Sequence, residues 1–145
     1  MVNEQGSKRY RLSYPVKVRF ADTDLQGHVF FGNYFTYCDE SFMAFLDEIG
    51  YSWHRLGSMG LELYYVESNC QFKGRAFWGD TLYVNTGIAH MGRSSMIVEM
   101  TIFKNNGNEI VAKGHIKAVM VSKETGRSTE IPNEFRKAIH KYEKT

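Results

Sequence analysis

The segment from Asp22 to Tyr34 holds the residue types in this chain that could carry out acid–base or nucleophilic chemistry. It contains two acids, two glycines and a histidine, just ahead of a pattern typical of a helix. The first turn of a helix offers backbone N–H groups without partners and a partial positive charge, which can polarise a carbonyl oxygen. A carboxylate beside that turn can act as a base or a nucleophile. This combination is suited to acyl transfer.

Other interpretations fit the same loop. Asp22, Asp24 and Gly27 match positions 1, 3 and 6 of an EF-hand calcium loop. However, Gln26 stands at position 5, and Asn33 replaces the bidentate Glu that position 12 requires. The Asp-x-Asp pair also resembles the metal site of sugar-nucleotide transferases, but those families need much larger chains. Finally, Asp and Asn are common turn and cap residues, and by spacing alone this structural interpretation is the stronger one.

A strand and a helix are predicted on either side of this loop. Tyr10 to Phe20 alternates apolar and basic residues, and Pro15 predicts that this strand lies at a sheet edge. Ala21 to Gly32 is then the loop itself. A helix is expected from an N-cap at Asn33 to a stop at Gly50, because apolar residues recur at three- and four-residue intervals between them. These residues are Phe35, Cys38, Phe42, Phe45, Leu46 and Ile49.

Most of the remaining chain is predicted as β-structure. Four segments have strand patterns: Leu61 to Phe72, Thr81 to His90, Ser95 to Lys104 and Glu109 to Ser122. Asn105 to Asn108 contains an Asn-Gly hairpin signal, Tyr51 to Gly60 is ambiguous with a possible helical turn, and a tail helix starts at Pro132. The order of strand, helix, four strands and helix predicts an α+β fold, in which an antiparallel sheet packs against the ring-rich helix.

Length and composition limit the class of protein. With 145 residues, the chain has room for one domain, 1–145, whose core needs no disulfide or metal. A net charge of +2 is too small to predict a nucleic-acid partner. Cys38 and Cys70 form no Cys-x-x-Cys pair, so we expect two free thiols in a reducing compartment.

The sequence shows no sign of a targeting segment or a metal motif. Residues 1–14 are polar and charged, without the apolar centre of a signal peptide, and no run approaches the roughly 18 apolar residues of a membrane span. The chain has neither a His-Glu-x-x-His motif nor a Gly-x-Ser-x-Gly nucleophile turn. We therefore expect a cytoplasmic protein with no metal site and no membrane partner.

The loop motif resembles that of the hotdog-fold acyl-CoA thioesterases. It reads Asp22-Thr23-Asp24-x-x-Gly27-His28-Val29-x-Phe31-x-Asn33-Tyr34. It is most similar to the 4-hydroxybenzoyl-CoA thioesterase branch and its relatives, which act on acyl-CoA or acyl-carrier-protein thioesters. The likeness spans roughly Tyr14 to Phe135. It implies a hotdog fold with an antiparallel sheet wrapped around a long central helix, edge-to-edge homodimers that often form homotetramers, and a substrate slot at the subunit interface.

The resemblance also implies roles for single residues. The second acid of the pair, Asp24, would be the catalytic carboxylate, as nucleophile or general base, while Asp22 would hold the loop. The backbone N–H of Phe31 would bind the thioester oxygen. Implied substrate contacts are Gly27, His28, Val29, Tyr34, Arg93 and Ser94, the last two at the nucleotide end of coenzyme A, with Lys73 and Arg75 as further basic candidates. No cofactor is implied, since coenzyme A is part of the substrate.

Two other functions stay open for the same fold. An enoyl-thioester hydratase or dehydratase would pair an acid with a histidine, and His28 is the one histidine near enough in sequence. A non-catalytic acyl-CoA-binding module would use Asp24 only as a turn residue. Other hotdog thioesterases use a glutamate on the central helix, but the glycine-rich motif that accompanies it is missing here, so Glu40 is expected in solvent. Some relatives carry a histidine where Gly32 stands, which leaves the acyl group open.

Overall fold

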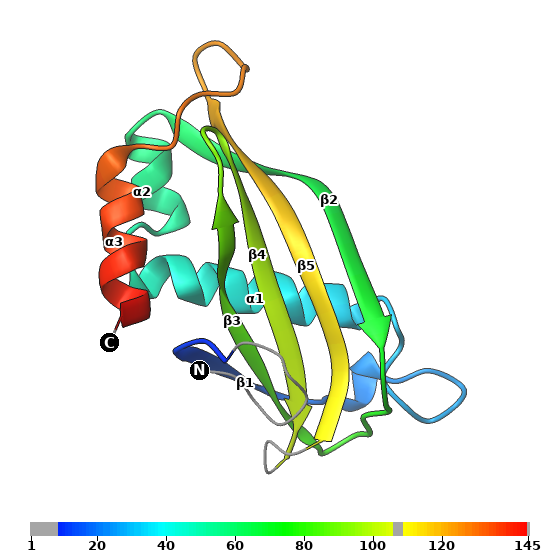
Figure 1. The fold of residues 1–145 in the computed structure, drawn as a ribbon. Helices are drawn as coiled ribbons and strands as arrows, with labels where there is room; N and C mark the ends of the chain where they lie inside the picture. The colour runs from blue at the N-terminus through cyan, green and yellow to red at the C-terminus, as the bar shows by residue number, and fades with distance from the viewer. Residues whose placement is uncertain (1–8, 106–108, 145) are drawn as a thin grey trace.

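The fold is an antiparallel sheet wrapped around one long helix (Figure 1). A computed structural model describes residues 9–105 and 109–144, and within them five strands follow the order β1-β3-β4-β5-β2. The strands are β1 (Leu12–Lys17), β2 (Leu61–Phe72), β3 (Thr81–Met91), β4 (Ser95–Lys104) and β5 (Glu109–Ser122). Helix α1 (Asn33–Glu48) crosses one face of the sheet, and α2 (Trp53–Ser58) and α3 (Asn133–Lys144) cover one end. The predicted α+β architecture is confirmed.

Strands β1 and β2 form the two edges of the sheet. Pro15 in β1 lies opposite Tyr83 of β3, which confirms the predicted edge position. Strand β2 pairs with β5 along its whole length, with a register shift between Tyr65 and Glu67. Among the described residues nothing pairs with the other side of β2, so its backbone N–H and C=O groups on that side are available to another strand.

The core lies between α1 and the sheet. Phe42, Phe45 and Leu46 of α1 are fully buried against the inward-facing residues of the strands. Those residues include Leu82, Val84, Met96, Val98, Met100, Ala112, Ile116, Ala118 and Met120. Each large apolar side chain buried in this way contributes roughly 1.5–3 kcal/mol. Phe35 was predicted on the buried face but is 37% exposed, because the helical period of 3.6 residues turns Tyr34 and Tyr37 inward instead.

The ends of the helices differ slightly from the prediction. The N-cap of α1 is Gly32 and not Asn33, which is the first helical residue and uses its side chain elsewhere. Gly50 follows the helix with a φ of +82°, as expected for a terminating glycine. The ambiguous segment after it contains α2, capped by Ser52. Most of the predicted Asn-Gly turn lies outside the described residues.

The described residues contain neither a candidate membrane-spanning helix nor a candidate metal site. No helix in residues 9–105 and 109–144 combines the length and apolar character needed to cross a membrane. Across the same residues, no group of three or more His, Cys, Asp or Glu side chains is placed to hold a metal ion.

Candidate active site

Asp22 is the anchor of the loop that precedes α1. Its buried carboxylate accepts hydrogen bonds from the Tyr37 hydroxyl at 2.9 Å, the Arg19 backbone N–H at 3.0 Å and the Arg19 guanidinium at 2.9 Å. Its backbone carbonyl accepts from the Phe30 N–H at 2.9 Å and from the Asn33 side-chain amide at 2.8 Å. The first acid of the motif is therefore fully engaged in holding the turn against α1.

These contacts also fix the charge of Asp22. Burial by itself raises the pKa of this carboxyl group, but the hydrogen bonds from Arg19 and Tyr37 outweigh burial and hold the pKa below its ordinary value. For Tyr37, burial and the hydrogen bond to Asp22 both raise the pKa of the phenol. The pair thus consists of a carboxylate that accepts and a neutral phenol that donates.

Asp24 stands at the base of a small hairpin. Its backbone N–H donates to the His28 carbonyl at 3.0 Å, and its carbonyl accepts from Gly27, whose φ of +86° closes the turn. One carboxylate oxygen, Oδ1, accepts from the Gln26 N–H at 2.8 Å. In the described part of the chain no donor reaches Oδ2. The hairpin docks on the segment before β3 through a hydrogen bond from the Val29 N–H to the Ala76 carbonyl, 2.8 Å long.

The Asp24 side chain borders an open cavity of about 480 Å³. The cavity is walled by Phe20, Leu25 and Trp78, all strongly exposed, and Asp24 itself is half-buried. Asp24 is therefore part of the wall of an open cavity and not part of the core. Phe20 and Trp78 were not predicted as site residues, because an aromatic residue in a turn gives no sign in the sequence of facing a cavity.

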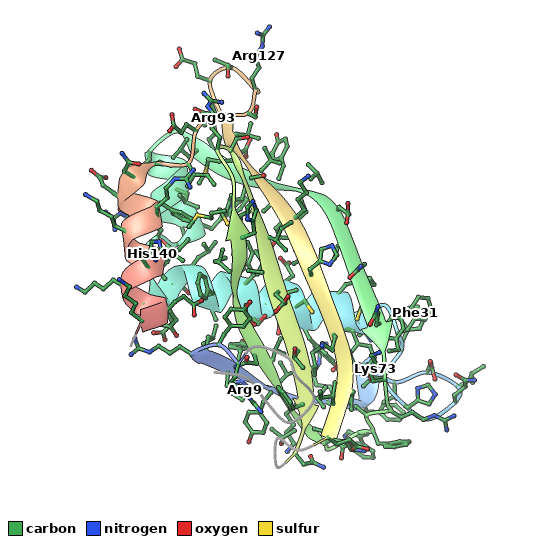
Figure 2. The ribbon with its side chains drawn as sticks, in the orientation of Figure 1. Arg9, Phe31, Lys73, Arg93, Arg127 and His140 are labelled. Atoms are coloured by element: carbon green, nitrogen blue, oxygen red, sulfur yellow. The ribbon has the colours of Figure 1, made fainter. Side chains whose placement is uncertain are left out.

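Phe31 lies in the turn that leads into α1. Within residues 9–105 and 109–144, its backbone N–H meets no hydrogen-bond acceptor. Its ring packs against Phe30 and Phe72, with centroid distances of 4.7 and 5.9 Å, and lies near the end of β2 in Figure 2. A free N–H at the positive end of a helix is the kind of group that can bind a carbonyl oxygen as it gains negative charge.

The other residues predicted in the motif have varied surroundings. His28 places Nδ1 3.2 Å from the Val29 carbonyl and the edge of its ring against Phe77. Val29 and Tyr34 are buried, with 1% and 3% of their surface exposed, so both side chains belong to the core. Gly27 supplies the left-handed turn that no other residue type adopts easily.

Arg93 and Ser94 lie far from this loop within one chain. Figure 2 shows Arg93 at the opposite end of the sheet from Phe31 and Lys73, with Arg127 beside it. The backbone of the Arg93 turn is held by Arg136 of α3, whose guanidinium donates to the Gly92 carbonyl at 2.6 Å and to the Arg93 carbonyl at 2.9 Å. Arg127 was not predicted, although the Gly-Arg turn in the sequence could have indicated it.

Two further cavities lie along α1. One, of about 580 Å³, is formed with α2 and β2 and is lined by Met43, Trp53 and Tyr65, whose hydroxyl donates to Asp39 at 2.5 Å. The other, of about 330 Å³, is polar and contains Glu40 beside Lys17 and Arg19. Glu40 is exposed, as predicted.

Comparison with known proteins identifies the class. The model of the thioesterase-like superfamily matches residues 18–139, so the chain belongs to that superfamily and has its hotdog fold.

Three relatives narrow this identification. The structure of a gentisyl-coenzyme A thioesterase is similar at 31% identity and a TM-score of 0.77, covering 88% of this chain and 98% of that one. The structure of a hypothetical protein from Aquifex aeolicus matches at 30% identity and a TM-score of 0.82, covering 88% and 98%. A 1,4-dihydroxy-2-naphthoyl-CoA hydrolase from Thermosynechococcus vestitus is 28% identical over 98 residues, 67% of each chain. The protein is a thioester hydrolase.

The Asp22 anchor leads to a prediction about stability and pH. Asp22→Asn should lower the free energy of unfolding at pH 7 by about 1.5–3 kcal/mol, because the hydrogen bonds to a buried charge are lost. The folded-state pKa of Asp22 lies below its unfolded value, so its contribution is complete above about pH 5 and is lost as the pH falls through the folded pKa. Urea unfolding of both proteins at pH 7 and about pH 3 should show the difference narrowing in acid.

Asp47→Asn is the matched control for this measurement. Asp47 is an exposed acid on α1, and its replacement should change stability by less than about 0.5 kcal/mol at either pH. A stability difference for Asp22→Asn that stays the same from neutral to acid pH would show that its charged form is not what holds the loop.

Proposed function

We propose that the chain hydrolyses acyl-CoA thioesters with Asp24 as the reacting carboxylate and the Phe31 N–H as the donor to the thioester oxygen. The observation that carries this proposal is that Asp24 lines a cavity beside the loop that leads into α1 and that, among the described residues, no donor occupies its Oδ2. Asp22 is committed to Tyr37 and Arg19 and has no such freedom.

The chemistry can follow either of two routes. As a nucleophile, Asp24 forms a bond to the thioester carbon while the C–S bond breaks and coenzyme A leaves as a thiolate. Water then cleaves the acyl–aspartyl anhydride, which releases the carboxylic acid and restores Asp24. As a general base, Asp24 instead takes a proton from the water that attacks the same carbon. In both routes the carbonyl oxygen becomes negative, and loss of one fixed donor such as the Phe31 N–H typically costs about 2.7–4 kcal/mol.

The ends of the substrate suggest that two chains form each site. Arg93 and Ser94, proposed to meet the nucleotide end of coenzyme A, lie at the opposite end of the same chain from Phe31. A second copy could bring its own Arg93 to the Asp24 loop. The unpaired side of β2 supports such a pair, because its strand carries the exposed residues Tyr64, Val66 and Phe72. We therefore propose a homodimer, which can associate further into a homotetramer.

The names of two relatives support a proposal for the substrate class. Two are named for aromatic acyl-CoA thioesters, of gentisic acid and of dihydroxynaphthoic acid, which favours an aromatic acyl-CoA over an acyl-carrier-protein thioester. We propose that hydrolysis needs no cofactor and takes place in the cytoplasm. The hydratase alternative gains no support from His28, because its Nδ1 lies against the Val29 carbonyl.

The role of Asp24 is tested by thiol release. Asp24→Ala should slow the release of free thiol from benzoyl-CoA at least about 100-fold, the contribution typical of a positioned acid–base group. Glu40→Gln is the control, since Glu40 is the acid that other hotdog thioesterases would use, and it should retain the wild-type rate. Loss of activity in Glu40→Gln with full activity in Asp24→Ala would reverse the assignment.

The role of Arg93 is tested with two forms of substrate. Arg93→Ala should raise KM for benzoyl-CoA about two- to fivefold, as expected for an exposed ion pair with phosphate, with little change in kcat. The benzoyl thioester of N-acetylcysteamine lacks the nucleotide, so its KM should not change. Equal effects on both substrates would show that Arg93 acts on something other than the phosphates.

The pairing of chains is tested at the β2 edge. Val66→Lys places a charge on a strand that we propose to be covered, so the protein should shift toward monomer in light scattering after size-exclusion chromatography. Ala89→Lys is the control. Ala89 is an exposed position on β3, so a Lys there should leave the mass unchanged. A Val66→Lys protein with the mass of the wild type would contradict pairing through this edge.

A further inference from the structure

An unusual aromatic surface surrounds Asp24. Phe20, Leu25 and Trp78 are 71%, 107% and 69% exposed, although each is large and apolar. The rings of Phe20 and Trp78 meet edge to face, with centroids 5.5 Å apart and planes at 68°. Clustered apolar exposure of this kind marks a surface that is covered by something in function.

Both rings stand on fixed backbone. Phe20 begins the short helical turn that Arg19 and Asp22 close, and its carbonyl accepts from the Thr23 hydroxyl at 2.7 Å. Trp78 lies in a turn in which the Asp80 carboxylate accepts from the Phe77 N–H at 2.8 Å. The next residue, Gly79, donates to the Val18 carbonyl at 3.1 Å, which ties that turn to the segment before Phe20. The backbone that carries both rings is therefore fixed, which reduces the ordering that a ligand must impose on this surface.

We infer that Phe20, Leu25 and Trp78 form the wall that receives the acyl group of the substrate and that this wall selects acyl groups carrying a flat ring. The inference rests on the proposed role of Asp24. Asp24 lines the same cavity as these three residues, so the substrate that reacts with Asp24 is the molecule expected in it. The carbon that Asp24 or its water attacks is the carbonyl carbon of the acyl group, bonded to the sulfur of coenzyme A on one side and to the rest of the acyl group on the other. The acyl group must therefore lie next to Asp24, and the apolar lining of this cavity suits it better than the polar pantetheine arm.

The chemistry of the cavity fits a ring better than a small or charged group. Asp24 is the one ionisable side chain among the described residues that line it. A charged or hydroxyl-rich acyl group would lose water there without regaining hydrogen bonds. The volume of about 480 Å³ is far larger than an acetyl group needs and lies within the range of small-molecule pockets, roughly 300–1,000 Å³. Aromatic groups also gain from edge-to-face contact with Phe and Trp.

The competing location is the cavity between α1, α2 and β2. It contains the Asp39–Tyr65 pair and one of the two tryptophans, Trp53, whereas the cavity beside Asp24 contains the other, Trp78. The two locations can therefore be distinguished by asking which tryptophan responds to the acyl group.

The first experiment measures selectivity. Trp78→Ala and Phe20→Ala should each lower the ratio of kcat/KM for benzoyl-CoA to that for acetyl-CoA at least about tenfold, since apolar contact with the ring is lost. Tyr83→Ala removes an aromatic ring from the face of the sheet that points away from α1, where it does not line this cavity, and should leave the ratio unchanged within about twofold. A ratio that stays at the wild-type value in both variants, or a change in oligomer mass with no change in ratio, would overturn the inference.

The second experiment does not depend on turnover. In an Asp24→Asn, Trp53→Phe protein, Trp78 is the only tryptophan, and its fluorescence should be quenched saturably by benzoyl-CoA and much less by acetyl-CoA. In an Asp24→Asn, Trp78→Phe protein, the emission of Trp53 should change little. The opposite pattern would place the acyl group in the other cavity and refute the inference.

The two proposals fail in different ways. If Asp24→Ala keeps the wild-type rate on both substrates, the catalytic proposal fails. If Asp24→Ala abolishes thiol release while Trp78→Ala and Phe20→Ala leave selectivity intact, the catalytic proposal stands and the acyl wall alone is refuted.

Discussion

The carboxylate of Asp22, buried at the start of α1, is the interaction on which the site depends. A charge removed from water is tolerated only when several donors surround it, and here Tyr37 and Arg19 provide them. The Tyr37 bond ties the loop to α1, while the Asp22 carbonyl holds Phe30 and Asn33. The entry of the chain into the helix, and with it the direction of the Phe31 N–H, follows from this one anchor. The Arg19 guanidinium is exposed, so water screens its attraction to Asp22.

The two acids of the motif have different surroundings, and these support a structural role for Asp22 and the proposed chemical role for Asp24. Asp22 is buried and saturated with donors, so it has no capacity left to react. Asp24, two residues later, uses one oxygen to hold the turn of its own hairpin, and its second oxygen meets no donor among the described residues. The same side chain thus gives two different behaviours, set by burial and by the number of donors that reach it.

The sequence could predict the elements and the loop because both depend on local patterns. Alternation in the strands, the helical repeat before Gly50 and the edge signal of Pro15 all arise from contacts between near neighbours. Phe35 was misplaced because it lies at the margin of the apolar face, where the pattern is ambiguous. The proposed acyl wall could not be foreseen, since Phe20 and Trp78 are 58 positions apart in the numbering and meet only because the backbone of Val18 pairs with that of Gly79 and Asp80. The distance of Arg93 from the loop likewise follows from the length of the strands.

Arg136 of α3 holds the backbone of the turn that contains Arg93, at the end of the sheet away from the Asp24 loop. Its guanidinium binds three main-chain oxygens, those of Gly92, Arg93 and Ile131, and no side chain of the turn takes part. The shape of that turn is thereby uncoupled from the identity of its side chains. If Arg93 meets the phosphates of coenzyme A, as proposed, the solvent-facing side chains of this turn can change, and the affinity for the substrate with them, while Arg136 of α3 keeps the backbone of the turn in place.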